Sequence, residues 1–181
     1  PVAYLESLER RVELIKEVGA EFVSVLQFTS ELQQVSAADF TRLLVEEARM
    51  RLLVVGEDFR LGRGGEGTTD RLAEIGEEQG FEVIPVPLYH DDDDAERVSS
   101  TRIRGALAEG RMEDVARLLG RPFAVRGPVL QGAQRGRTIG FPTLNIGISA
   151  DRALPPNGVY VSRAHHGGRT YMAATNIGTN P

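Results

Sequence analysis

The chain of 181 residues is 41% hydrophobic and contains no cysteine. This length suits one large domain or two small ones with a buried core. The lack of cysteine excludes disulfides, thiolate metal sites and a cysteine nucleophile, and it favours a reducing, cytoplasmic location. No apolar run approaches the roughly 20 residues of a membrane helix, and no signal-peptide pattern opens the chain. We therefore expect an intracellular protein with no membrane partner.

Charge is distributed unevenly along the chain. Residues 1–120 carry 14 Lys or Arg and 25 Asp or Glu, whereas residues 121–181 carry seven Arg and only Asp151. Opposite signs in the two parts suggest two modules, and the basic part suits an anionic ligand. The same arginines are also compatible with an ordinary solubilising surface.

Helix and strand patterns alternate in residues 1–120. Ser7 can cap a helix that Gly19 ends, and residues 21–28 (EFVSVLQF) form an apolar run that predicts a buried strand. Ser36 and Asp39 have capping-box spacing and predict the start of a second helix.

The alternation continues to Gly120 and predicts a parallel α/β sheet with right-handed crossovers. Residues after Gly120 are rich in Gly, Pro and β-branched types, so we expect a mostly β module and a boundary near residue 120. The further expected elements follow in this order: a strand at 52–56, a helix at about 69–79 ended by Gly80, a strand at 81–89, short helices near 101–109 and 112–119, and a hairpin with its turn at 165–168.

A glycine-rich loop follows the strand at 52–56. Gly62, Gly64 and Gly67 have the G-x-G-x-x-G spacing of dinucleotide-binding turns. In such turns the first glycine leaves the strand directly, and an acidic residue ends the next strand. Here EDFRL intervenes and that acidic residue is missing. The pattern therefore disfavours a dinucleotide-binding turn.

The stretch RVSSTRIRGAL combines hydroxyl groups with arginines at a predicted helix start. Ser99, Ser100 and Thr101 lie where backbone N–H groups lack helical partners, Arg104 is one turn further, and Arg97 approaches from the loop. Such groups form a strong oxyanion site. A simple Ser/Thr cap beside solvent-exposed arginines explains the spacing equally well.

The stretch QRGRTIGFPTLNI contains a second group of polar residues. Arg135, Gly136 and Arg137 supply cations on a flexible backbone. In an extended segment Thr143 and Asn145 point to the same face. Their hydroxyl and amide oxygens could complete a Mg²⁺–phosphate site. A β-turn with local hydrogen bonds is the alternative.

Together these stretches resemble the bacterial bifunctional riboflavin kinase/FMN adenylyltransferase, or FAD synthetase, family. The resemblance spans nearly the whole chain. It rests on S-S-T-x-x-R and G-F-P-T-x-N in this order, joined by LLGRPF and accompanied by VVGEDFRLGRGGEG, LPPNGVY and ATNIGTNP.

The resemblance implies that residues 1–120 form an FMN adenylyltransferase domain with a nucleotidyltransferase-like α/β fold. In it Arg97, Ser100, Thr101 and Arg104 would bind the ATP phosphates, and Asp58 would lie beside the nucleotide and flavin cleft. The FMN phosphate would attack the α-phosphorus of ATP and give FAD and pyrophosphate. Positioning and charge neutralisation dominate such catalysis.

The resemblance further implies that residues 121–181 form a small antiparallel β-barrel that phosphorylates riboflavin. Thr143 and Asn145 would hold Mg²⁺ and ATP, and the loop with Arg135, Gly136 and Arg137 would cover the phosphates. ATP is then the co-substrate, and riboflavin, FMN and FAD are substrates or products. The expected partners are small molecules. The arginines lack the interleaved aromatic residues typical of nucleic-acid binding.

Several departures from the family pattern affect these expectations. The G-x-F-D-G-x-H-x-G-H motif that opens the family is absent, and the glutamate expected to act as base in the kinase would lie beyond Pro181. We therefore expect both domains to be incomplete, and the chain alone to be inactive and poorly soluble or partly molten. Leu61 replaces a usual aromatic residue and Gln131 a common His, which puts flavin affinity in question.

Two other functions remain open from the sequence. The chain could belong to a different adenylyltransferase of the same superfamily, although GFPTLN is not expected there. It could also be a non-catalytic regulatory module that binds ATP or flavin. Histidines in H-x-G-H spacing upstream and an acidic residue downstream would favour the enzyme.

Overall fold

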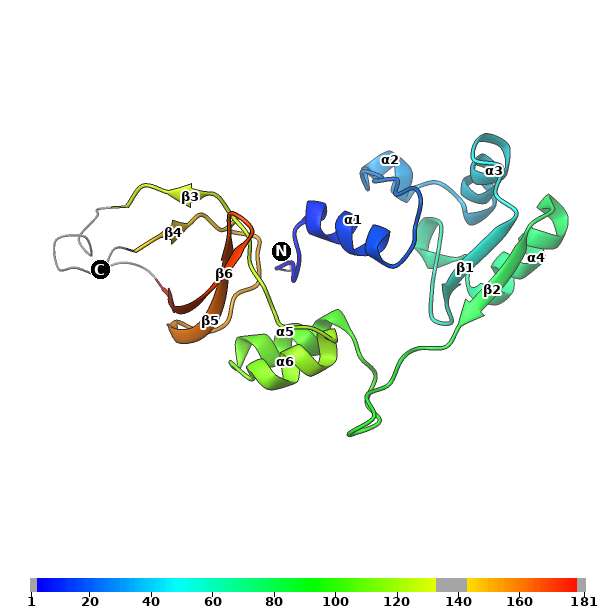
Figure 1. Ribbon diagram of the computed structural model, residues 1–181. Coiled ribbons are helices and arrows are strands. Elements are labelled where there is room, and N and C mark those ends of the chain that lie inside the picture. The colour runs from blue at the N-terminus through cyan, green and yellow to red at the C-terminus, as the bar shows by residue number, and fades with distance from the viewer. Residues whose placement is uncertain (1–2, 133–142, 179–181) are drawn as a thin grey trace. The chain divides into compact units, whose positions relative to one another are not determined.

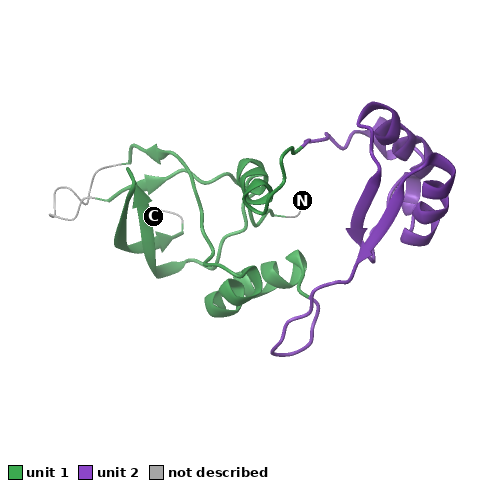
Figure 2. Ribbon diagram, turned by 45° about the vertical axis from the view of Figure 1, so that its right-hand side comes forward, with its two compact units in different colours: residues 1–23, 98–181 green, residues 24–97 purple. Residues whose placement is uncertain are grey.

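The computed structural model describes residues 3–132 and 143–178 (Figure 1). The chain divides into two compact units, residues 24–97 and residues 1–23 together with 98–181, which Figure 2 distinguishes by colour. The elements in chain order are α1 (Leu8–Glu17), α2 (Ser30–Gln33), α3 (Ala37–Glu47), β1 (Leu52–Gly56), the 3₁₀ turn η1 (Arg63–Gly65), α4 (Thr69–Gln79), β2 (Glu82–Val86), α5 (Ser100–Ala108), α6 (Met112–Leu119), β3 (Val129–Leu130), β4 (Asn145–Ile146), β5 (Gly158–His166) and β6 (Arg169–Ile177).

The unit of residues 24–97 is built on one strand–helix–strand repeat. β1 and β2 pair in parallel, from Leu52 opposite Glu82 to Gly56 opposite Val86, and α4 connects them. The predicted parallel pairing of these two segments is therefore confirmed. Gly80 adopts a left-handed conformation and ends α4, as its position after the apolar pattern predicted.

Only one face of this two-stranded sheet is covered. Leu53 and Val83 pack against the buried side chains Leu72 and Ile75 of α4, together with Ala37 of α3. Side chains alternate along a strand, so the intervening residues point to the opposite face. That face is apolar and 40–56% exposed at Leu52, Val54, Ile84 and Val86.

The prediction of a buried strand at residues 21–28 was wrong. The structure has no strand there, and Phe22 and Phe28 are 89% and 74% exposed. An apolar run becomes a buried strand only if a neighbouring strand accepts its hydrogen bonds and another layer covers it. Within the described residues, none of the strands pairs with this segment.

Side-chain caps confirm the predicted helix starts. The Ser7 hydroxyl accepts a hydrogen bond from the Arg10 N–H at 3.2 Å. Ser36 accepts from the Asp39 N–H at 3.1 Å, so the predicted cap forms, and it donates to the Asp39 carboxylate at 2.6 Å. In a full capping box this carboxylate would instead accept from the Ser36 backbone N–H. Each cap satisfies a backbone donor that the first helical turn leaves without a partner.

In the other unit, α5 and α6 provide most of the core. The buried residues are Ile103, Ala106 and Leu107 of α5, Val115 of α6, and Ala153.

The predicted hairpin forms as β5 and β6, which pair antiparallel from Gly158 opposite Ile177 to His166 opposite Arg169. Gly167 and Gly168 both have positive φ, at 56° and 74°, which is the requirement of a two-residue type I′ turn. The turn is thus shorter than predicted, and both histidines belong to the strand.

Beyond residue 120 the described chain is β-rich, as predicted. β3 pairs with β4 and β5 pairs with β6, in two separate antiparallel sheets. The described residues form no closed barrel, and the barrel remains a prediction. None of the helices in the described part of the chain has the length and apolar character needed to cross a bilayer.

Candidate functional site

The glycine-rich loop between β1 and α4 is shaped by close packing against α3. Gly62 has φ 79° and ψ 178°, and a Cβ there would lie 2.4 Å from the Ala37 backbone nitrogen. A Cβ on Gly67 would lie 2.7 Å from the Ala37 Cβ, whereas one on Gly64 would meet no atom within 4 Å. Two of the three glycines are therefore required by the close approach of the backbone to α3, which supports the rejection of a dinucleotide-binding turn.

A cavity of about 490 Å³ lies beside this loop within the same unit. Its lining includes Phe28, Gln33, Gln34, Arg60 and Arg63, and no carboxylate is among the described lining residues. Two guanidinium groups with neutral amides and an aromatic ring suit an anionic ligand that also has a ring. The sequence analysis missed this site, although arginines flank the first glycine of the motif.

Asp58 and Arg97 form an ion pair at the carboxyl ends of the parallel strands. Asp58 follows β1, and Arg97 lies on the segment that follows β2. The Arg97 Nη1 is 2.6 Å from the Asp58 Oδ2, and the side chains are 48% and 47% exposed. Ligands of open α/β sheets bind at this end of the strands. The sequence analysis named Asp58 and Arg97 as candidate site residues, but it did not predict that they contact each other.

The start of α5 brings two of the predicted phosphate-binding residues together. Ser99 caps the helix by accepting from the Arg102 N–H at 3.2 Å, and Ser100 and Thr101 are exposed in the first turn. Arg104 Nη2 donates to Thr101 Oγ1 at 3.2 Å. The guanidinium thus lies at the end of the helix where the backbone dipole also favours an anion.

Thr143 and Asn145 are both exposed, next to the short β3–β4 ladder. Asn145 begins β4 and pairs with Leu130 of β3. A Cβ on Gly132 would lie 1.9 Å from Asn145 Nδ2, so the amide group rests against the Gly132 backbone. Gly132 is therefore a supporting position that the sequence analysis missed. The predicted residues Arg135, Gly136 and Arg137 lie outside the described residues.

The oxygen atoms of Thr143 and Asn145 fit the ligand preferences of Mg²⁺ in part. A hydroxyl and an amide carbonyl are hard oxygen donors, and Mg²⁺ in nucleotide sites takes further oxygens from phosphates and water. Across residues 3–132 and 143–178, no group of three or more His, Cys, Asp or Glu side chains could hold a metal ion. A cation at this position would therefore depend on oxygens of the bound nucleotide.

Comparison with known proteins assigns the chain to a family. The family described as FAD synthetase matches residues 1–102, which is more than half of the chain and includes β1, α4, β2 and the start of α5. The chain belongs to the FAD synthetase family. A second family, described as riboflavin kinase, matches residues 119–181.

Curated relatives of this family member are named bifunctional riboflavin kinase/FMN adenylyltransferase. The Listeria monocytogenes protein is 35% identical over 99% of this chain, and the Escherichia coli K12 protein is 36% identical over 99%. The Bacillus subtilis protein is 32% identical over the whole chain. The chain spans 56–57% of the length of these relatives.

A solved structure is also similar. A crystal structure described as a macrolide-efflux protein from Streptococcus pneumoniae has a TM-score of 0.86 and 31% identity. The similarity covers 99% of this chain and 57% of that one.

Proposed function

We propose that this chain contributes to FAD synthesis through two ATP-dependent reactions, phosphorylation of riboflavin to FMN and adenylylation of FMN to FAD. The observation that carries the proposal is the order of the two family matches in one chain. The first contains Asp58, Arg97 and the start of α5, and the second contains Thr143 and Asn145. The names of the curated relatives agree with both reactions.

In the proposed adenylylation, a phosphate oxygen of FMN attacks the α-phosphorus of ATP. The bond between the α-phosphorus and the bridging oxygen breaks, and pyrophosphate leaves. We assign the binding of the ATP phosphates to Arg97, Ser100, Thr101 and Arg104, and we place Asp58 beside the nucleotide and flavin cleft. Guanidinium and helix-start N–H groups support this role, because they stabilise negative charge without having to reorganise. The corresponding domain is residues 1–120, with a nucleotidyltransferase-like fold.

In the proposed kinase reaction, a riboflavin hydroxyl attacks the γ-phosphorus of ATP, and ADP leaves. We assign residues 121–181 to this domain and expect it to form a small barrel. Thr143 and Asn145 would hold Mg²⁺, which neutralises phosphate charge when it is bound, and the loop with Arg135, Gly136 and Arg137 would cover the phosphates. The exposed oxygen donors beside β4 support this assignment.

The test uses the protein expressed from its complete coding sequence, incubated with riboflavin and ATP, with FMN and FAD separated by chromatography. Arg104→Ala should slow the conversion of FMN to FAD and leave FMN formation intact. Thr143→Ala should abolish FMN formation, yet still give FAD when FMN is supplied. Arg163→Ala, at an exposed position of β5, serves as the control and should affect neither reaction.

The two-site assignment requires that Arg104→Ala and Thr143→Ala impair different reactions. If Arg104→Ala and Thr143→Ala impaired the same reaction to the same extent, the assignment of one site to each reaction would be wrong. If neither variant changed either reaction, the phosphate-binding roles of both residues would be refuted.

A further inference from the structure

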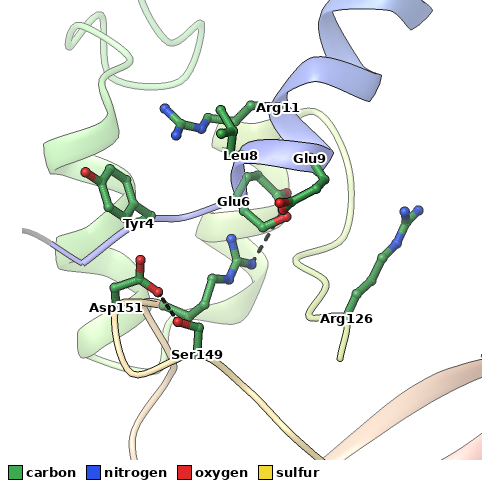
Figure 3. A pocket seen from close by; sticks show the side chains of 10 residues that line it. Tyr4, Glu6, Leu8, Glu9, Arg11, Arg126, Ser149 and Asp151 are labelled. Carbon is green, nitrogen blue, oxygen red and sulfur yellow. Dashed lines mark hydrogen bonds and ion pairs between the residues drawn. The ribbon is translucent and has the colours of Figure 1, made fainter. Parts of the chain in front are cut away.

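The segment before α1 is hydrogen-bonded to residues that match the riboflavin kinase family. The Tyr4 N–H donates to the Asp151 carbonyl at 2.7 Å, and the Ala153 N–H donates to the Tyr4 carbonyl at 2.9 Å. These bonds form a parallel bridge between residues 4 and 152. Figure 3 shows Tyr4 and Glu6 on the N-terminal segment, beside Ser149 and Asp151. Residues that match the FAD synthetase family therefore contact residues that match the riboflavin kinase family here, within one compact unit.

Glu6 is the negatively charged side chain of this contact. Its side chain is 11% exposed and forms ion pairs with Arg121 and, at 3.5 Å, with Arg152. The Arg152 side chain is only 7% exposed and also donates to the Ala124 carbonyl at 3.3 Å. Glu6 is the one carboxylate among the described residues that pairs with Arg152. Its removal would leave a buried guanidinium without a counter-charge, which is strongly unfavourable.

Apolar packing accompanies the ion pairs at this contact. Ala3 and Leu5 pack against the buried cluster that contains Ala153 and residues of α5. A cavity of about 430 Å³, lined by Tyr4, Glu6, Arg126 and Arg152 among others, also lies beside the contact (Figure 3). The contact therefore combines apolar packing with the ion pairs of Glu6.

We infer that Glu6, Arg121 and Arg152 form an ion-pair junction that fixes the FAD synthetase part of the chain to the riboflavin kinase part. The inference rests on the family matches and the contacts, and it does not require either proposed reaction. Because the buried cluster includes α5, the junction also supports the helix that carries Ser100 and Thr101.

An exposed ion pair between the same two parts provides a matched control. Arg126 Nη1 lies 2.8 Å from Glu13 Oε2, and these side chains are 67% and 47% exposed. Water screens such a pair, so its loss changes stability little. Glu6→Gln and Glu13→Gln each remove one negative charge from one side of the contact, and they differ in burial.

The experiment is amide hydrogen exchange of the protein expressed from its complete coding sequence, read at the Tyr4 and Ala153 N–H groups. In Glu6→Gln both amides should exchange about tenfold faster or more, because local opening of the contact becomes easier. In Glu13→Gln the change should stay within about twofold. The Glu82 N–H, bonded to the Arg51 carbonyl in the other unit, should keep its protection in both variants.

Unchanged exchange in Glu6→Gln, or equal acceleration in Glu13→Gln, would overturn the inference. If Glu6→Gln unfolds the whole unit, so that α5 and α6 also lose protection, Glu6→Asp decides, because it keeps the negative charge beside Arg121 and Arg152. It should retain more of the protection of Tyr4 and Ala153 than Glu6→Gln does. Equal loss of protection in Glu6→Asp and Glu6→Gln would show that the charge of Glu6 does not hold the junction.

Discussion

Replacement of the glycines in the loop after β1 tests the reason for the G-x-G-x-x-G spacing. Gly62 and Gly64 both have positive φ, at 79° and 65°. They differ in what surrounds them, because a Cβ on Gly62 would collide with the Ala37 backbone and one on Gly64 would reach open space. If packing against α3 maintains this motif, Gly62→Ala should destabilise the unit of residues 24–97 far more than Gly64→Ala.

The expected difference follows from two contributions. Gly62 has ψ 178°, which together with its φ lies in a region open almost only to glycine, and alanine there costs about 1–3 kcal/mol. Displacement of the Ala37 backbone from a 2.4 Å contact adds roughly 1–3 kcal/mol, as in other overpacked sites. Gly64 has ψ 9°, so alanine there incurs only the left-handed backbone cost of about 1–2 kcal/mol. The lower flexibility of alanine in the unfolded chain partly offsets this cost.

Amide exchange in residues 24–97 is the suitable assay, because a chain with two compact units has no single unfolding free energy. The Glu57 N–H, bonded to the Val86 carbonyl at 2.9 Å, reports on this unit. Gly62→Ala should accelerate its exchange by roughly one and a half to four orders of magnitude, since each 1.4 kcal/mol is a factor of ten. Equal acceleration in Gly62→Ala and Gly64→Ala would refute the packing explanation.

Two further substitutions test a helix cap and a supporting glycine. The hydrogen bond from the Ser36 hydroxyl and the charge of Arg42 hold the pKa of Asp39 below its usual 3.8. Because the folded pKa is lowered, this stabilisation is complete above pH 3.8 and is lost as pH falls through the folded pKa. Asp39→Asn should therefore accelerate amide exchange in residues 24–97 near pH 7, and its difference from the wild type should shrink as pH falls below 3.8. Gly132→Ala should displace the Asn145 amide and slow riboflavin phosphorylation, with FMN adenylylation and the fold nearly unchanged, since the displaced group is the end of a flexible side chain. A wild-type rate of FMN formation would show that the Asn145 position is not needed.

Local signals in the sequence were sufficient to predict where most helices begin and end. The caps at Ser7 and Ser36 were correctly predicted, because a cap depends on groups within one turn of the same residue. The left-handed glycines after α4 and α6 are equally local. The parallel pairing of β1 with β2 was also predictable, because an intervening helix of this length normally returns the chain in the same direction.

Structural features that depend on residues far away in the sequence could not be predicted from local signals. The apolarity of residues 21–28 predicted burial, but apolarity alone does not specify the surface that would cover it. The spacing of Gly62 and Gly67 was visible, yet its reason lies in Ala37, which precedes both by a whole helix and strand. Likewise Gly132 carries no chemical group that could mark it as the support of Asn145.

The ion pair of Asp58 and Arg97 has a consequence for the proposed adenylylation. Both side chains are about half exposed, so the pair contributes at most about 1 kcal/mol to stability. A triphosphate can therefore replace the carboxylate as the partner of Arg97 at low cost. A free arginine side chain loses up to roughly 2 kcal/mol of conformational freedom when it is immobilised, and the contact with Asp58 already imposes part of that loss. If Arg97 binds the ATP phosphates as proposed, the pair with Asp58 would orient its guanidinium before the nucleotide binds.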